Sequence, residues 1–245
     1  MPILNTYQFL QETQKPETTY VIFARHGESE SNALKRVGGS SRLSDVNLTE
    51  KGMEEAQQLG EALAPFRGQF KTIYSSPLNR AHQTASIALK AMGSEMLELN
   101  IDERIKEKFF GKAIDGQPHA IYNQFAEKEK AETEKMSFSQ KWGYAVVEDA
   151  EKHQKVYERV KAFMLDVAKK HPKEIVLAFG HKVSSIKIPV IGALMENGIE
   201  VDYRDPSFNP INCSTVVFAV DPNLEKIELI AIDGFTFSLL ANQYQ

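Results

Sequence analysis

Apolar residues along the chain form short runs that alternate with segments of helical spacing. Runs rich in β-branched and aromatic residues predict five buried strands, and a weaker run at Leu97–Ile101 predicts a sixth. The five stronger strands are Thr19–Ala24, Thr72–Ser75, Glu174–Gly180, Ser214–Val220 and Lys226–Ile232. Segments of helical spacing separate these strands, so the sheet is expected to be covered on both faces.

Three segments between the strands predict helices. Thr49–Leu63 begins with a threonine suited to an N-cap, a second helix follows Pro77, and the third, Val147–Lys170, ends before Pro172. The first helix is predicted to turn inward Met53, Ala56, Leu59, Gly60 and Leu63, and the second Ala81, Thr84, Ala85, Ala88 and Leu89. Strands alternating with helices predict an α/β fold with a mainly parallel central sheet flanked by helices on both faces.

The segment Gln117–Ala145 lacks this pattern. Its centre, Glu127–Lys135, alternates acidic residues and lysines, which is typical of a solvated helix face. Phe138, Trp142 and Tyr144 follow, and packing beneath the surface is favoured over substrate binding for them. Residues 112–145 are therefore predicted to be a lid or an insertion.

The chain of 245 residues can bury a core without disulfides or metals, and no hinge or internal repeat divides it. Residues 1–245 are therefore predicted to be one domain, with its core at about 19–233. The formal net charge of −4, with mixed signs, argues against nucleic acid and membrane partners. The absence of a leader-like or membrane-spanning run predicts a cytoplasmic protein. The single cysteine, Cys213, is predicted to be structural.

The most informative motif is RHGESESN, Arg25–Asn32, directly after the first strand. A neutral imidazole can attack phosphorus, and an adjacent guanidinium can neutralise phosphoryl oxygens. Gly27 is expected to leave room for a ligand near the backbone. Asn32 is a candidate neutral donor to phosphate, or alternatively an ordinary capping amide. Although an isolated RHG can also be a capping turn with a solvated histidine, the motif predicts phosphate chemistry on His26.

Two further motifs place cationic or imidazole groups beside such a site. Arg80 lies in the first turn of the helix after Pro77, where the helix dipole disfavours a cation unless an anion is near. An exposed arginine pointing into water is the alternative. His181 follows the strand that ends at Gly180, as His26 follows its own strand. The two histidines are therefore predicted to converge at the carboxyl edge of the sheet.

Glu107, in the sequence IKEKFFG, is the candidate general acid. Beside Phe109 and Phe110 its carboxyl group would be poorly solvated, and desolvation favours the protonated form of a carboxyl group. The competing acids on spacing alone are Glu98, Asp102 and Glu103.

The remaining histidines carry weaker signals. His82 follows Arg80 on the helix, His119 lies in a loop of unknown position, His153 lies in a charged stretch, and His171 ends a helix. No paired-cysteine or HExxH spacing indicates a metal site. Catalysis without a metal or another cofactor is expected.

In these motifs the chain resembles the histidine phosphatase superfamily, the phosphoglycerate mutase-like fold. The resemblance extends from Tyr20 to about Leu229. It rests on RHGESESN, LTEKGMEEAQQLG, SSPLNRAHQTA, EKFFG, FGH and INCSTVV, in that order. The KAIDG sequence after Phe110 and Gly111 departs from the acidic or aromatic pattern common in the family.

The resemblance implies roles for the candidate residues. His26 would attack phosphorus and become a phosphohistidine. Arg25, Arg80 and His181 would hold the phosphoryl oxygens, with Asn32 assisting. Glu107 would protonate the leaving oxygen and then activate water.

A metal-independent phosphomonoesterase is the function that this resemblance favours, with a small phosphorylated substrate or a phosphoprotein as its partner. Mutases of the family carry paired arginines between the acid and the second histidine, whereas no arginine lies between Arg104 and Arg159 here. Phosphoglycerate mutase-type transfer is the alternative. A non-catalytic phospholigand-binding or regulatory module is an alternative of another class, although every catalytic position is filled. The loops Glu30–Asn47, Lys112–Ala145 and Ile199–Ile211 are expected to shape the mouth; the substrate and oligomeric state stay open.

Overall fold

The computed structural model describes residues 5–13, 16–201, 203–204 and 208–234, and its centre is a six-stranded sheet in the order β3-β2-β4-β1-β5-β6. The strands are β1 Thr19–Arg25, β2 Phe70–Ser75, β3 Leu99–Ile101, β4 Ile175–Gly180, β5 Thr215–Asp221 and β6 Lys226–Asp233. β1 pairs with β4, and β2 with β4 and β3, in parallel, whereas β5 runs antiparallel to both β1 and β6. The predicted mainly parallel sheet is confirmed, including its weakest strand.

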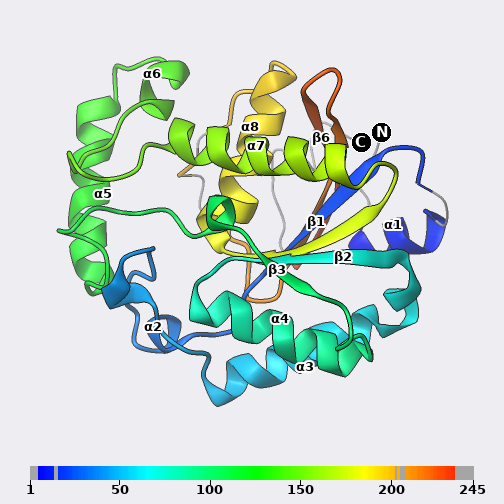
Figure 1. The fold of residues 1–245 in the computed structure, drawn as a ribbon. Coiled ribbons are helices and arrows are strands. Elements are labelled where there is room, and N and C mark those ends of the chain that lie inside the picture. Colours follow the sequence, from blue (N-terminus) through cyan, green and yellow to red (C-terminus); the bar gives the residue numbers. More distant parts are fainter. Residues whose placement is uncertain (1–4, 14–15, 202, 205–207, 235–245) are drawn as a thin grey trace.

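Helices cover both faces of this sheet (Figure 1). The helices are α1 Thr6–Glu12, α2 Glu30–Ala33, α3 Glu50–Leu63, α4 Asn79–Met92, α5 His119–Thr133, α6 Phe138–Trp142, α7 His153–Lys170 and α8 Ile188–Glu196. One apolar cluster joins α7 and α8 to the sheet, and a second joins α1, α3 and α4 to its other face. Successive side chains of β1 point to opposite faces of the sheet, so Phe23 lies in the first apolar cluster and Ile22 in the second.

Helix α3 meets the turn after β1 through two glycines. A Cβ on Gly52 would lie 1.9 Å from the Glu28 carbonyl oxygen, and one on Gly27 would lie 2.3 Å from the Gly52 oxygen. Gly27 therefore admits the backbone of α3, whereas the sequence predicted that it admits a ligand. The close approach also rotates the helix, so that Gly52 is buried and Met53, predicted to face inward, is 44% exposed. The rest of the predicted inner face of α3, and that of α4, is buried as expected.

Helix α7 begins at His153, whereas the sequence pattern predicted a start at Val147. Residues 147–152 instead pack against the segment that follows Glu107 and form a hydrogen bond with it. The Glu151 amide donates to the Phe109 carbonyl oxygen (2.8 Å), and the Val147 side chain lies against Gly111. These long-range contacts outweigh the local helical spacing.

The segment between β3 and α7 carries α5 and α6. Trp142 is buried in the same cluster as α7, its ring lies 5.9 Å from that of His153, and Phe138 stacks on it at 6.3 Å. The prediction that these aromatic residues pack beneath the surface is confirmed for Trp142. Tyr144 instead donates a hydrogen bond to Glu132 on α5.

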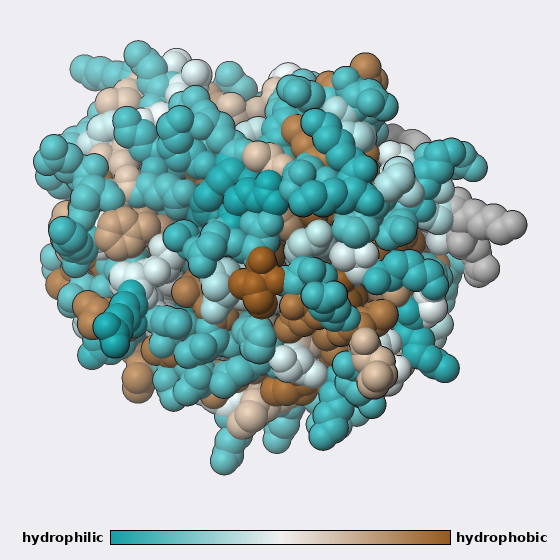
Figure 2. Space-filling view, in the orientation of Figure 1, coloured by the Kyte–Doolittle hydropathy of each residue, from teal (hydrophilic) through white to brown (hydrophobic). Residues whose placement is uncertain are grey.

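The face of the molecule drawn in Figure 2 is mostly hydrophilic, with hydrophobic side chains in small separate groups. In the described part of the chain, none of the helices has the length and apolar character needed to cross a membrane. Cys213 is half-buried against the cluster beneath α3 and α4, and burial raises the pKa of its thiol to about 12. Of the predicted mouth loop at 199–211, residues 202 and 205–207 lie outside the described residues.

Candidate active site

The two histidines singled out by the sequence lie side by side. β1 and β4 are neighbours in the sheet, and Arg25 pairs with Gly180 at their carboxyl ends. His26 and His181 are the next residues of the two strands, and the His26 amide donates to the Gly180 carbonyl oxygen (3.0 Å). Their ring centroids are 5.3 Å apart. The predicted convergence at one edge of the sheet is therefore present in the structure.

The contacts of His26 fix its tautomer. Its Nδ1 lies 2.7 Å from the Gly27 carbonyl oxygen, and a carbonyl can only accept. The ring proton is thus on Nδ1, and Nε2 carries a lone pair. Burial, followed by the charges of Arg80 and Arg25, holds the pKa of His26 well below its ordinary range. His26 is a neutral imidazole with a basic, nucleophilic Nε2.

His181 is fully buried, and its ring packs edge-on against that of His26. One ring nitrogen, Nε2, lies 2.8 Å from the Ser76 hydroxyl, whereas Nδ1 is buried without a hydrogen-bond partner among the described residues. Burial and the charge of Arg80 hold the pKa of His181 well below its usual value. The ring is therefore neutral in the unliganded protein, with one nitrogen unsatisfied.

Both predicted arginines are buried, and both retain an unused donor. Arg25 donates from Nη1 to the Pro210 carbonyl oxygen (2.8 Å), and burial lowers its pKa to about 10, so that it is charged at neutral pH. Arg80 donates to backbone carbonyls at three positions of the loop before α3, Gly38, Gly39 and Ser44. The exposed alternative for Arg80 is therefore wrong. The Nε of each arginine is buried without a partner in the described residues. Buried donors of this kind are satisfied by an acceptor that enters the site.

A cavity of about 300 Å³ opens over these groups. Its wall includes the predicted site residues Arg25, His26, Asn32, Arg80 and Glu107. The sixth, His181, lies behind the wall, in contact with His26. Of the four acids weighed as proton donors, Glu107 alone lines this cavity.

Asn32 has the capping role that the sequence offered as one alternative, and it also lines the cavity, so its role as a donor to phosphate stays a prediction. Its Oδ1 accepts from the Ser29 amide (3.1 Å) and from Asn212 Nδ2 (3.3 Å), which closes a capping box at the start of α2. This use of the oxygen leaves the Nδ2 group as the donor on the cavity wall. An anion in the cavity could accept from it.

Glu107 is held by backbone amides from both sides. Oε1 accepts from the amides of Lys108 (2.8 Å) and Ser184 (2.9 Å), and Oε2 accepts from the amide of Val183 (3.1 Å). Val183 and Ser184 belong to the π-helical turn Lys182–Lys187 that follows His181, where the first amides lack intrahelical partners. The carboxyl group is thereby fixed to the same segment as His181.

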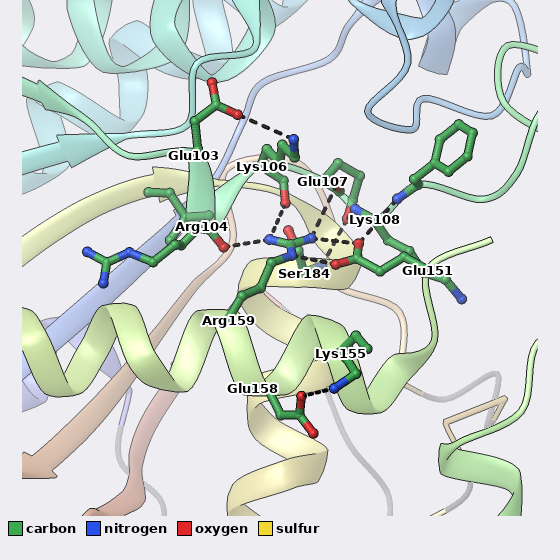
Figure 3. A network of polar contacts seen from close by, with 12 residues as sticks. Glu103, Arg104, Lys106, Glu107, Lys108, Glu151, Lys155, Glu158, Arg159 and Ser184 are labelled. Atoms are coloured by element: carbon green, nitrogen blue, oxygen red, sulfur yellow. Dashed lines mark hydrogen bonds and ion pairs between the residues drawn. The ribbon is translucent and has the colours of Figure 1, made fainter. Parts of the chain in front are cut away.

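The loop that carries Glu107 is fastened from α7 by Arg159 (Figure 3). The guanidinium of Arg159 donates to the carbonyl oxygens of Arg104, Lys106 (2.9 Å) and Glu107 (3.4 Å), and its Nε pairs with Glu151 (2.7 Å). One half-buried side chain therefore fixes the backbone on both sides of Lys106.

Several wall residues were not found by sequence reasoning. They are Ser29, Arg36, Val37, Gly38, Phe110, His119, Tyr122, Asn123, Lys182, Val183 and Lys187. A signal existed for Lys182, which directly follows His181, and for Ser29 within RHGESESN. The α5 residues His119, Tyr122 and Asn123 carry no local signal, because only the tertiary position of α5 brings them to the cavity.

We expect Lys182 to make anion binding in this cavity depend on pH. Burial, together with the charge of Arg25, lowers its pKa to about 8, so the ammonium loses its proton as the pH rises through that value. Sulfate, which keeps its charge over this range, is expected to bind about tenfold more weakly at pH 9.5 than at pH 7. Calorimetry should show a flat profile in this range for Lys182→Met and an unchanged one for the exposed-lysine control Lys130→Met. A wild-type affinity that does not change with pH would contradict this role.

The site thus combines a neutral imidazole with buried cationic donors. Within the described part of the chain, no group of three or more His, Cys, Asp and Glu side chains is arranged to hold a metal ion. The arrangement of Arg25, Arg80 and His26 is suited to bind an oxyanion and to attack its central atom.

Comparison with known proteins gives concordant results. A family model described as histidine phosphatase superfamily, branch 1, matches residues 21–233. A 2,3-bisphosphoglycerate-dependent phosphoglycerate mutase of Nocardia farcinica is 35% identical over 112 residues, which is 46% of this chain and 44% of that protein. The chain thus matches less than half the length of this curated relative.

Solved structures share the fold over most of the chain. A phosphoglycerate mutase from Bacillus anthracis has a TM-score of 0.72 at 22% identity, covering 94% of this chain and 99% of that one. A phosphoserine phosphatase mutant from Entamoeba histolytica, in complex with phosphoserine, has a TM-score of 0.68 at 23% identity, covering 87% and 96%. The phosphoglycerate mutase-like fold predicted from the sequence is confirmed.

Proposed function

The chain belongs to the histidine phosphatase superfamily, branch 1, and on that premise we propose that it hydrolyses a small phosphomonoester through a phosphohistidine on His26. The observation that carries the proposal is the state of His26. Its Nδ1 is bound to a carbonyl, its ring is neutral, and it shares a cavity wall with Arg25 and Arg80. Among the described residues, the buried Nε donor of each arginine has no partner. A small substrate is favoured because a structural neighbour was solved with phosphoserine.

In the first step His26 Nε2 attacks phosphorus as the ester P–O bond breaks. The electron pair of that bond goes to the leaving oxygen, which takes a proton from Glu107. Arg25, Arg80 and the Nδ2 group of Asn32 hold the phosphoryl oxygens while charge develops on them. His181 donates to an oxygen of the same phosphoryl group from its Nδ1, which has no hydrogen-bond partner among the described residues.

In the second step water attacks the phosphohistidine. The Glu107 carboxylate, left ionised by the first step, accepts the proton of that water. The P–N bond breaks, and its electron pair returns to Nε2. Inorganic phosphate leaves, and both His26 and Glu107 recover their starting states.

Mutase-type phosphoryl transfer is the second candidate, favoured by the name of the curated relative. The absence of any arginine between Arg104 and Arg159 supports hydrolysis instead, because paired guanidinium groups are suited to hold the carboxylate of phosphoglycerate. The two candidates differ in their product. A hydrolase releases inorganic phosphate from phosphoglycerate, whereas a mutase converts one isomer into the other.

The proposal is tested with 4-nitrophenyl phosphate and with phosphoglycerate, each in buffer and in excess chelator. Nitrophenol and inorganic phosphate are expected at equal rates in both buffers, because protein cations take the role that a metal ion would have in the proposed chemistry. Loss of turnover on chelation, restored by one divalent ion, would contradict metal independence. Isomerisation without phosphate release would assign the protein to the mutases. If neither hydrolysis nor isomerisation is observed, the non-catalytic phospholigand-binding module is the alternative that is left.

A further inference from the structure

A second, smaller cavity of about 80 Å³ adjoins the catalytic one. The two share the wall residues Phe110, Tyr122, Val183 and Lys187. Much of the second cavity is lined by apolar side chains of α5 and of the turn before α7. Its polar lining includes Lys108 and His153. The mechanism proposed above uses neither of these two residues.

Lys108 presents a buried positive charge to this cavity. The residue is 8% exposed, and its Nζ lies 3.0 Å from His153 Nε2 and 5.4 Å from the centre of the Phe110 ring. Among the described residues, this ammonium has His153 as its hydrogen-bond partner and makes no ion pair with a carboxylate. Burial lowers the pKa of Lys108, while Glu129 and Glu151 act against that shift. A buried ammonium without a carboxylate partner is rare, because desolvation of the charge is costly.

His153 adds a second unused donor. Burial and the charge of Lys108 lower the pKa of His153, so its imidazole is neutral. The Lys108 ammonium donates to Nε2 of this ring, and the ring proton is therefore on Nδ1. That Nδ1 is buried and has no hydrogen-bond partner in the described residues. The cavity therefore offers the remaining ammonium hydrogens and an imidazole N–H, all of which require an acceptor.

The sequence order links this pair to the proposed chemistry. Lys108 directly follows Glu107, so the proton donor and the ammonium are carried on adjacent Cα atoms, about 3.8 Å apart. Glu107 lines the catalytic cavity and Lys108 the second one. A leaving alcohol that receives a proton from Glu107 would extend its substituents past Phe110 toward Lys108.

The charged groups on the wall of the second cavity indicate which kind of ligand it binds. The wall carries two ammonium groups, Lys108 and Lys187, and one carboxylate, Glu129. With His153 neutral, one positive charge is left over, which matches a carboxylate better than a second phosphate dianion. Glu129 is on the same wall and accepts a hydrogen bond from the Tyr203 hydroxyl. The negative charge of Glu129 favours the charged form of Lys108, although the two side chains form no ion pair in the described residues.

We propose that the second cavity binds a carboxylate on the alcohol part of the substrate, with Lys108 as the specificity-determining residue and His153 as its positioning partner. The substrate class is then the phosphomonoesters of short hydroxy acids. This inference rests on the proposed phosphatase function.

The experiment compares esters that differ in the carboxylate alone or nearly so. The pairs are phosphoserine with phosphoethanolamine, and 3-phosphoglycerate with glycerol 3-phosphate, with 4-nitrophenyl phosphate as a reference. The wild type is expected to have a kcat/KM at least tenfold higher for the carboxylate member of each pair. Lys108→Met should remove this preference, largely through KM, while activity on the nitrophenyl ester stays within about twofold. Lys112→Met, which removes an exposed lysine from the same loop, should retain the preference.

The possible results distinguish failure of the carboxylate-binding inference from failure of the proposed phosphatase function. Equal kcat/KM for both members of each pair in the wild type would overturn the inference without any variant. If folded Lys108→Met still prefers the carboxylate member of each substrate pair, the inference is overturned as well. The same holds if the wild type hydrolyses the nitrophenyl ester but neither pair of alkyl esters. If Lys108→Met unfolds, Lys108→Gln, which retains a donor toward His153, is assayed in its place. Failure to hydrolyse the nitrophenyl ester would instead count against the phosphatase function.

Discussion

Replacement of His26 by alanine is expected to lower phosphatase activity by about 10³-fold or more. The reason is covalent, because Nε2 of this imidazole is proposed to form the bond to phosphorus, and a cationic pocket without a nucleophile has nothing to transfer the phosphoryl group to. Wild-type protein quenched during turnover should carry phosphate that is labile in acid and stable in alkali. The variant should carry none.

Two controls separate loss of chemistry from loss of structure. His26 is 4% exposed, so its truncation leaves a small cavity that costs about 1–3 kcal/mol of stability. Thermal unfolding of His26→Ala should therefore remain cooperative at a modestly lower temperature. His82→Ala removes an exposed histidine from α4 and should keep full activity. Wild-type turnover by a folded His26→Ala protein would refute the phosphohistidine mechanism.

The sequence predicted the sheet well because burial on both faces leaves a strong signal. The continuous apolar character of β1 and β4 marks two central strands, and the residues that follow them must emerge at the same edge when the strands run parallel. The proximity of His26 and His181 follows from that geometry alone. Thr49 was likewise identified as the N-cap of α3 from local chemistry, and its side chain accepts from the Gly52 amide (3.0 Å).

The errors arose where contacts between distant parts of the chain decide the local structure. Met53 has helical spacing with the buried face of α3, but the contact of Gly52 with the turn at Glu28 rotates it outward. Residues 147–152 have helical spacing too, yet they pair with the loop after Glu107. No local pattern contains such information, since the partner lies elsewhere in the sequence.

Lys108 and His153 were missed for a related reason. In the sequence both stand among charged residues, which is typical of a solvated surface. Their burial depends on α5 and on the turn before α7, which close the second cavity over them. A buried charged residue is recognised from its surroundings, and these surroundings come from segments that are far apart in the sequence.

Glutamine in place of Glu107 is expected to affect substrates according to their leaving group. An alkoxide is a poor leaving group that needs a proton as the P–O bond breaks, whereas nitrophenolate leaves readily without one. Glu107→Gln should therefore lower kcat by about 10²- to 10³-fold for an alkyl phosphate, and by less than about tenfold for 4-nitrophenyl phosphate. The alkyl ester should be chosen to match the aryl ester in size.

The difference between the two esters separates proton donation from positioning. Glutamine keeps the shape of the side chain and can still accept from the Lys108 and Ser184 amides through one oxygen, while its NH₂ group faces the Val183 amide. That lost contact disturbs both esters alike, because it acts on the geometry of the loop and not on the leaving group. Glu103→Gln, which removes an exposed carboxylate from the same region, should change neither rate. Equal losses on both esters in Glu107→Gln, or a larger leaving-group effect in Glu103→Gln, would place the proton donor at another residue.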